Sequence, residues 1–155
     1  MLGLFRKRNI AAGDMLFGEY IALGRILRAE GMNDIERTKA IVKTLHNKYV
    51  SDTIALLLIP YGLQVAEGYL AWQEKENQEC HVPPRPEATQ AGIDQLAKEV
   101  GDMATVVQFA ERFGRTFEQV YNMPYLEVFA IWKVDAATAR YQRRLDAVLK
   151  SRKDK

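Results

Sequence analysis

Few side chains in this sequence could act as nucleophiles or as acid–base groups. The chain of 155 residues has two serines and one cysteine. Ser51 follows His46 by five residues, but the G-x-S-x-G turn that exposes a serine nucleophile does not surround it. Ser51 is therefore interpreted as a turn or cap residue. Carboxylate pairs such as Glu99 with Asp102 fall on helix faces that we expect to be solvated, whereas catalytic acid–base pairs occur in clefts. We expect that the protein is not an enzyme and has no catalytic residues.

A metal or cofactor site is not expected either. Cys80 and His81 are adjacent, and Glu76 and Glu79 are the nearby side chains that could join them as ligands. A metal site would need more ligands than the adjacent Cys–His pair supplies. The sequence has no G-x-x-x-x-G-K-[ST] motif, and no G-x-G-x-x-G motif between a strand and a helix. We therefore expect no metal and no cofactor, and an ordinary exposed thiol at Cys80.

The elements that hold these residues are predicted to be helices. Apolar residues make up 48% of the chain, which is enough for a core, and the common residue types are helix formers. The single cysteine excludes an intramolecular disulfide and favours a reducing compartment. No signal peptide is recognised, and the longest apolar run, residues 54–63, is too short to cross a membrane. We expect a cytoplasmic protein with no membrane partner.

The chain is predicted to be all-α, with five to seven helices in two packed helical halves. Composition divides it into an N-terminal arm, a first helical half, a Pro-rich linker, a second helical half and a basic tail. In order, these segments are 1–13, 14–77, 78–87, 88–150 and 151–155. The prolines of the linker hold it extended and exclude a helix. Because each half alone has a small core, we expect the two halves to pack together.

Capping residues predict where four of the helices begin. The predicted starts are Asp14 for a helix over 15–30, Asn33 with Glu36 for the next helix, Thr116 with Gln119 for 117–121, and Pro124 for a last helix that runs to about residue 150. A further helix is expected over 88–113, with a possible bend at Gly101.

The stretch before the linker is the most ambiguous. Residues 53–59 are consistent with a strand or a helix, and we favour a helix because no second strand is available to pair with it. Pro60 is expected to interrupt this helix, and another is expected over 61–77. The apolar stripe of that second helix is assigned to Leu63, Ala66, Tyr69, Leu70 and Trp72.

The net charge of +2 conceals an uneven distribution. Residues 6–8 carry +3 and residues 138–155 carry +5, which leaves −6 for the residues between them. Two interpretations are open. The basic ends are either solvated termini that keep the protein soluble, or surfaces for an acidic partner or for head-to-tail self-association.

Aromatic residues gather around the start of the last predicted helix. They either pack in the core against the first half, or form a groove for a partner helix. We assign them as the candidate partner-binding residues: Phe117, Tyr121, Tyr125, Phe129 and Trp132.

A basic patch lies further along the same helix, at Arg140, Arg143 and Arg144. Such a cluster is a candidate contact for nucleic acid, although aromatic residues other than Tyr141 do not alternate with it. The simpler interpretation is a basic helix C-terminus, which the helix dipole favours.

The turn before the last helix also carries a family resemblance. Its residues are Phe113, Gly114, Thr116, Glu118, Val120, Tyr121, Pro124 and Tyr125. This turn, followed by a long helix from Leu126, resembles the C-terminal half of the tail assembly chaperones of long-tailed bacteriophages and prophages. The segment FGEYIALGRIL, residues 17–27, is similar to the start of helical proteins encoded just before the tape-measure gene.

This resemblance implies a non-enzymatic virion-assembly protein of the bacterial host cytoplasm, or of the virion. Tail assembly chaperones bind the long, helical, aggregation-prone tape measure protein and bring tail tube subunits to it. The expected partner is therefore a long helical client or another tail or capsid component, and the family has no catalytic residues to carry over. The alternative is a small nucleic-acid-binding protein or structural virion adaptor that uses the basic helix.

Overall fold

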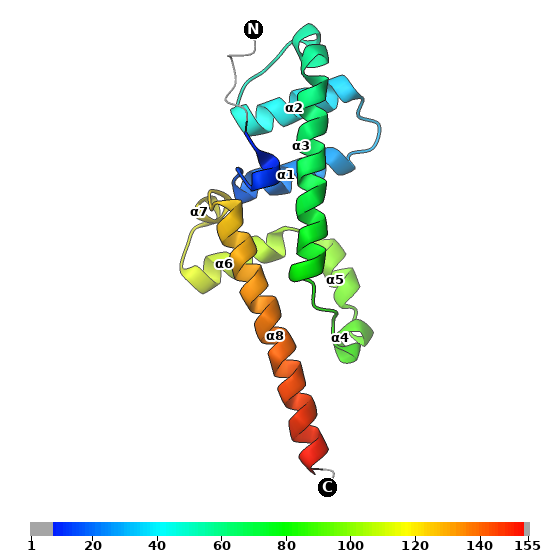
Figure 1. The fold of residues 1–155 in the computed structure, drawn as a ribbon, viewed down its shortest axis with the longest axis vertical. Coiled ribbons are helices and arrows are strands. Elements are labelled where there is room, and N and C mark those ends of the chain that lie inside the picture. The colour runs from blue at the N-terminus through cyan, green and yellow to red at the C-terminus, as the bar shows by residue number, and fades with distance from the viewer. Residues whose placement is uncertain (1–7, 154–155) are drawn as a thin grey trace.

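A computed structural model describes residues 8–153, and over this range the chain is all-α with no β-strand (Figure 1). It has eight α-helices and a short 3-10 helix, where five to seven helices were expected. In order, they are η2 (Ile10–Ala12), α1 (Phe17–Arg28), α2 (Asp34–His46), α3 (Asp52–Glu79), α4 (Pro86–Gln90), α5 (Ile93–Val100), α6 (Met103–Phe113), α7 (Phe117–Tyr121) and α8 (Tyr125–Lys153). Residues 1–7 of the predicted arm and residues 154–155 of the predicted tail lie outside the described range.

Helix α1 begins after Leu16, and Asp14 is not its cap. The backbone N–H of Leu16 donates to the carboxylate of Glu19 over 2.6 Å. Glu19 in turn accepts two hydrogen bonds from the guanidinium of Arg8, at 2.6 and 2.8 Å. This charge-assisted pair fixes both the helix start and the segment before it, which a single Asp cap could not do.

The other three starts that were predicted from capping residues are confirmed. Asn33 and Glu36 form a reciprocal capping box at the start of α2. Thr116 and Gln119 form a second one at α7. Helix α8 begins directly after Pro124, so the turn that carries the family resemblance is a tightly capped connection between α6 and α8.

Helix α3 is continuous from Asp52 to Glu79, so the ambiguous residues 53–59 are helical as favoured. Pro60 lies inside this helix, and the predicted interruption there is wrong. Both Pro60 and Leu56, whose carbonyl loses its N–H partner, are exposed. Water can therefore satisfy that carbonyl, which allows the helix to continue through the proline.

The predicted linker and the helix after it also differ from expectation. Helix α3 extends into the linker and α4 begins at Pro86, where proline occupies the first helical turn and its missing N–H costs nothing. The predicted helix over 88–113 is divided into α4, α5 and α6. Gly92 and Gly101 cause the breaks, because both adopt positive φ, which a right-handed helix cannot contain.

One hydrophobic core draws residues from both sides of the Pro-rich segment. The starts of α1 and α8 are joined by two backbone hydrogen bonds, from Phe17 N–H to the Met123 carbonyl (2.8 Å) and from Tyr125 N–H to the Met15 carbonyl (2.9 Å). The ring of Tyr20 on α1 stacks on that of Tyr125 at 4.4 Å between centroids. Beyond this junction, the C-terminal part of α8 extends away from the other helices (Figure 1).

Candidate functional site

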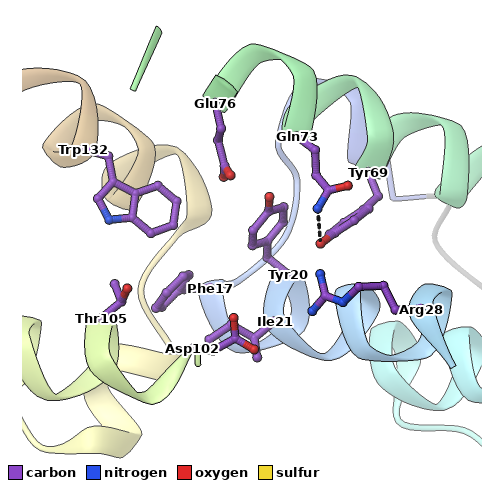
Figure 2. A pocket seen from close by; sticks show the side chains of 10 residues that line it. All are labelled: Phe17, Tyr20, Ile21, Arg28, Tyr69, Gln73, Glu76, Asp102, Thr105 and Trp132. Atoms are coloured by element: carbon purple, nitrogen blue, oxygen red, sulfur yellow. Dashed lines mark hydrogen bonds between the residues drawn. The ribbon is translucent and has the colours of Figure 1, made fainter. Parts of the chain in front are cut away.

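A cavity of about 180 Å³ lies where α1, α3 and α8 meet the start of α6 (Figure 2). Aromatic rings and titratable side chains both face it, a combination that is typical of sites for ligand binding or acid–base chemistry. Helix α1 contributes four of the lining residues and α3 contributes three. The lining residues are Phe17, Tyr20, Ile21, Arg28, Tyr69, Gln73, Glu76, Asp102, Thr105 and Trp132.

Glu76 is the central polar group of this cavity. Its half-buried carboxylate accepts a hydrogen bond from the phenol group of Tyr125. Burial raises the pKa of Glu76 above the usual carboxyl value, and the hydrogen bond from Tyr125 opposes that rise. Burial, together with the nearby carboxylate, raises the pKa of both Tyr20 and Tyr125 far above the usual phenol value. The phenols therefore stay protonated and act as hydrogen-bond donors.

Three more polar side chains of the cavity, Gln73, Tyr69 and Asp102, are also paired within the chain. The side-chain amide of Gln73 donates to the hydroxyl of Tyr69 over 3.1 Å (Figure 2). The carboxylate of Asp102 lies 3.6 Å from the guanidinium of Arg25. In the part of the chain that the structure describes, no group of three or more His, Cys, Asp or Glu residues could hold a metal ion. The arrangement is that of a polar network that orients three helices.

Replacing Glu76 by glutamine is expected to reduce the loss of stability as pH rises through the acidic range. The pKa of Glu76 is raised in the folded state, so its contribution is fully present below the unfolded carboxyl pKa and is lost as pH rises through the folded one. A glutamine stays neutral and can still accept from Tyr125. As the pH is raised from about 4 to about 7, we expect the melting temperature of the variant to increase relative to that of the wild-type protein.

Thermal unfolding of both proteins between about pH 4 and pH 7 measures this difference. Taking the difference cancels the contributions of the other carboxylates. A difference that is constant across the window would mean that Glu76 has the same pKa in the folded and unfolded chain.

The structure separates the five aromatic residues that were predicted to bind a partner. Tyr125 and Phe129 are buried in the core, and Tyr125 is fully inaccessible. Tyr121 and Trp132 are half-buried. Phe117 alone among the five is exposed. Core packing, the alternative left open by the sequence, accounts for Tyr125 and Phe129, and the five residues do not form one exposed groove.

Two of the three residues in the predicted basic patch hold the Pro-rich segment against α8. The guanidinium of Arg140 donates to the carbonyls of Glu79 (2.9 Å) and His81 (3.1 Å). That of Arg143 donates to the carbonyl of Pro83 at 2.5 Å. Guanidinium groups suit this role because their donors form a planar fork. These two side chains therefore stabilise the chain's own connection between α3 and α4.

Arg144 is the exposed member of the basic patch. A further ion pair, between Arg85 and Asp146 at 3.0 Å, strengthens the contact between α8 and the Pro-rich segment. The basic patch thus divides into residues that bind the chain's own backbone and one that faces solvent.

Other residues with chemical potential also serve the fold. Nε2 of His46 lies 2.8 Å from the hydroxyl of Tyr61, and burial lowers the pKa of His46. Ser51 is the N-cap of α3, as expected, and its hydroxyl accepts from the N–H of Ile54. Cys80 is half-buried at the end of α3, where an exposed thiol was expected. Burial raises the pKa of this thiol and so lowers its reactivity.

An exposed apolar row runs along α3, and we call it the outer seam of α3. Its members are spaced three and four residues apart: Leu56, Ile59, Leu63, Ala66 and Leu70. The three leucines are 56%, 57% and 58% exposed, and the other two residues are half-buried. This spacing is the heptad pattern by which one helix packs along another. The outer seam is therefore an apolar surface with heptad spacing that no other part of the described chain covers.

The sequence contained the signal for this seam, but the break predicted at Pro60 divided it. Leu63 and Leu70 were then assigned to one stripe with Tyr69 and Trp72, which face the core from the other side of α3. By length and composition alone, α3 could also cross a membrane, and just 28% of its most apolar window is buried. Both observations reflect the same feature, an apolar surface on α3 that residues 8–153 leave uncovered.

Comparison with protein-family models, curated proteins and solved structures gave no match to this chain.

Proposed function

We propose that this protein is a non-enzymatic assembly protein that binds a long amphipathic helix of another protein along the outer seam of α3. The observation that carries the proposal is the heptad row itself, five apolar positions on one continuous helix. The resemblance of the turn before α8 to phage tail assembly chaperones supplies the class of client, a tape-measure-like helical protein. In this proposal the protein acts in the host cytoplasm and has no catalytic role.

The dimensions of the seam favour a helix as its occupant. From Leu56 to Leu70 the seam extends along about 21 Å of helix, at 1.5 Å per residue. The opposite face of α3 is fixed in the core by Val65, Tyr69 and Trp72. A client helix would therefore bind a surface that is already ordered, which reduces the entropic cost of association.

The composition of the seam favours reversible binding. The seam leucines are already partly covered, so completing the burial of each contributes about 1 kcal/mol, and the loss of translational and rotational freedom offsets much of that sum. We expect micromolar affinity, as suits a chaperone that must release its client. Glu67 is the one charged residue between Leu56 and Leu70, so the affinity should depend weakly on salt.

Replacing Leu63 by glutamate is expected to weaken client binding about tenfold or more, because it places a charge in the middle of an apolar contact. The measurement is fluorescence anisotropy of a labelled peptide of about four heptads from a tape-measure-like coiled-coil protein. The matched control is Gln64→Glu, which adds the same charge at an exposed neighbouring position away from the seam. This control should retain the wild-type affinity within about twofold, with both variants equally stable.

Co-expression gives the second measurement, with the complete coiled-coil protein in place of the peptide. The wild-type protein and Gln64→Glu should raise the soluble fraction of the client and elute with it in gel filtration, whereas Leu63→Glu should not. If the wild-type protein, Gln64→Glu and Leu63→Glu all bind the client equally, the outer seam of α3 is not the binding surface. If none binds the client, and the wild-type protein instead binds lipid vesicles in a Leu63-dependent way, the seam is a membrane contact and the proposal is wrong.

A further inference from the structure

Helix α5 has an apolar face that the described chain does not cover. Ile93, Leu96 and Val100 lie on one side of this helix and are 39%, 54% and 39% exposed. Within the described residues, α5 packs against its chain neighbours α4 and α6 and against no other helix. A helix of eight residues is too short to be stable by propensity alone, so it needs packing against its apolar face.

The C-terminal half of α8 has a second uncovered apolar face, at Tyr141, Leu145 and Val148. This face points away from the Pro-rich segment. Arg143, which binds that segment, precedes Leu145 by two residues and so lies about 200° around the helix from it. The contacts that hold α8 to its own chain therefore leave this face open to solvent.

The spacings of the two faces match in opposite chain directions. Along α5 the apolar positions advance by three and then by four residues, and along α8 they do so when read backward from Val148. In an antiparallel pair, Leu96 lies opposite Leu145, while Ile93 and Val100 lie opposite Val148 and Tyr141. Each layer then joins one a-type to one d-type position, which is how antiparallel helices interlock.

Net charge also distinguishes the two segments that carry these faces. Residues 86–102, which include α4 and α5, carry a net charge of −3, and residues 139–152 carry +4. In the antiparallel alignment, Glu99 on α5 and Arg144 on α8 lie at the same edge of the contact. Both are next to the opposed pairs Leu96–Leu145 and Val100–Tyr141. Charges at these flanking positions select the partner and orientation of paired helices. Two α8 faces or two α5 faces would instead place like charges together.

We propose that the apolar α5 face of one copy of this protein binds the apolar α8 face of a second copy, antiparallel and head to tail, with Glu99 and Arg144 paired at its edge. Each copy then still has one free α5 face and one free α8 face, so the contact generates a chain or a ring of copies rather than a closed two-fold dimer. The contact spans about two helical turns. It is therefore weak, and it strengthens as the salt concentration falls.

The experiment uses the full chain and two single substitutions on exposed residues, Leu96→Glu on α5 and Leu145→Glu on α8. Light scattering after gel filtration should show concentration-dependent oligomers for the wild-type protein, shifted toward the monomer by high salt. Each variant alone should be monomeric. An equimolar mixture should form a dimer and nothing larger, because one intact α5 face and one intact α8 face remain. Ala147→Glu, on the far side of α8, is the matched control and should behave like the wild-type protein.

An exchange of charges tests the orientation. Glu99→Arg and Arg144→Glu should each weaken association about tenfold, and the double variant should recover most of the loss. Circular dichroism of each monomeric variant verifies that its helices are intact. A wild-type protein that stays monomeric at every concentration, as it would if α5 folded back on its own α8, overturns the proposal. A mixture of the two Leu→Glu variants that stays monomeric, or a double variant weaker than either single one, overturns it too.

Discussion

Replacing Tyr125 by alanine is expected to lower the free energy of unfolding by about 4 kcal/mol, a large part of the stability of a domain of this size. The side chain of Tyr125 is fully buried. Its ring lies 4.4 Å from that of Tyr20 and 5.1 Å from that of Trp72, between centroids. Its hydroxyl is a hydrogen-bond donor to Glu76. The substitution therefore opens a cavity between α1, α3 and α8 and removes a donor from a half-buried carboxylate.

Denaturant unfolding measures this loss, and two further variants divide it into its parts. Tyr125→Phe keeps the ring and removes the hydroxyl, so it should cost about 1 to 3 kcal/mol. Phe117→Ala, from the same predicted partner-binding group, truncates an exposed ring and should change stability by less than about 0.5 kcal/mol. Equal stability of Tyr125→Ala and Phe117→Ala would show that Tyr125 does not belong to the core.

Local signals in the sequence were sufficient to predict the all-α class and the capped starts of three helices. The capping boxes at Asn33 and Thr116 each depend on residues within four positions of one another, and both are present. The helix class of residues 53–59 followed from the lack of a second strand. Apart from the breaks at Gly92 and Gly101, the failures occurred where tertiary surroundings decide the local structure. Arg8 sets the start of α1 through Glu19, and solvent exposure allows α3 to continue through Pro60.

The candidate sites were harder to predict, because they depend on which way an apolar face points. Tyr20, Glu76 and Tyr125 come from three helices that are distant in sequence, and no spacing connects them. Leu63 and Tyr69 belong to the same apolar helix, but Leu63 is exposed and Tyr69 is buried. Periodicity identifies a stripe, but the neighbours that would cover it are a property of the tertiary fold.

Replacing Gly68 by valine is expected to lower the free energy of unfolding by about 3 kcal/mol. A Cβ atom at this position would lie 2.9 Å from the backbone nitrogen of Ala11 and 3.3 Å from the carbonyl carbon of Ile10. Backbone atoms cannot move aside as a side chain can, so η2 would have to separate from α3. That shift would also break the buried hydrogen bond from the indole N–H of Trp72 to the Ile10 carbonyl, which is 2.8 Å long. Denaturant unfolding of the variant and the wild-type protein measures the cost.

A matched pair of alanine variants isolates this contact from the general effect of glycine in a helix. Gly62 lies in the same helix, and the atom nearest to a Cβ placed there is the hydroxyl oxygen of Thr38, at 2.9 Å, which can rotate away. Alanine is favoured over glycine in a helix by about 1 kcal/mol, so Gly62→Ala should be neutral or stabilising. Gly68→Ala should be destabilising by about 1 to 2 kcal/mol despite the same gain. Equal changes at the two positions would mean that η2 does not pack against α3 through its backbone.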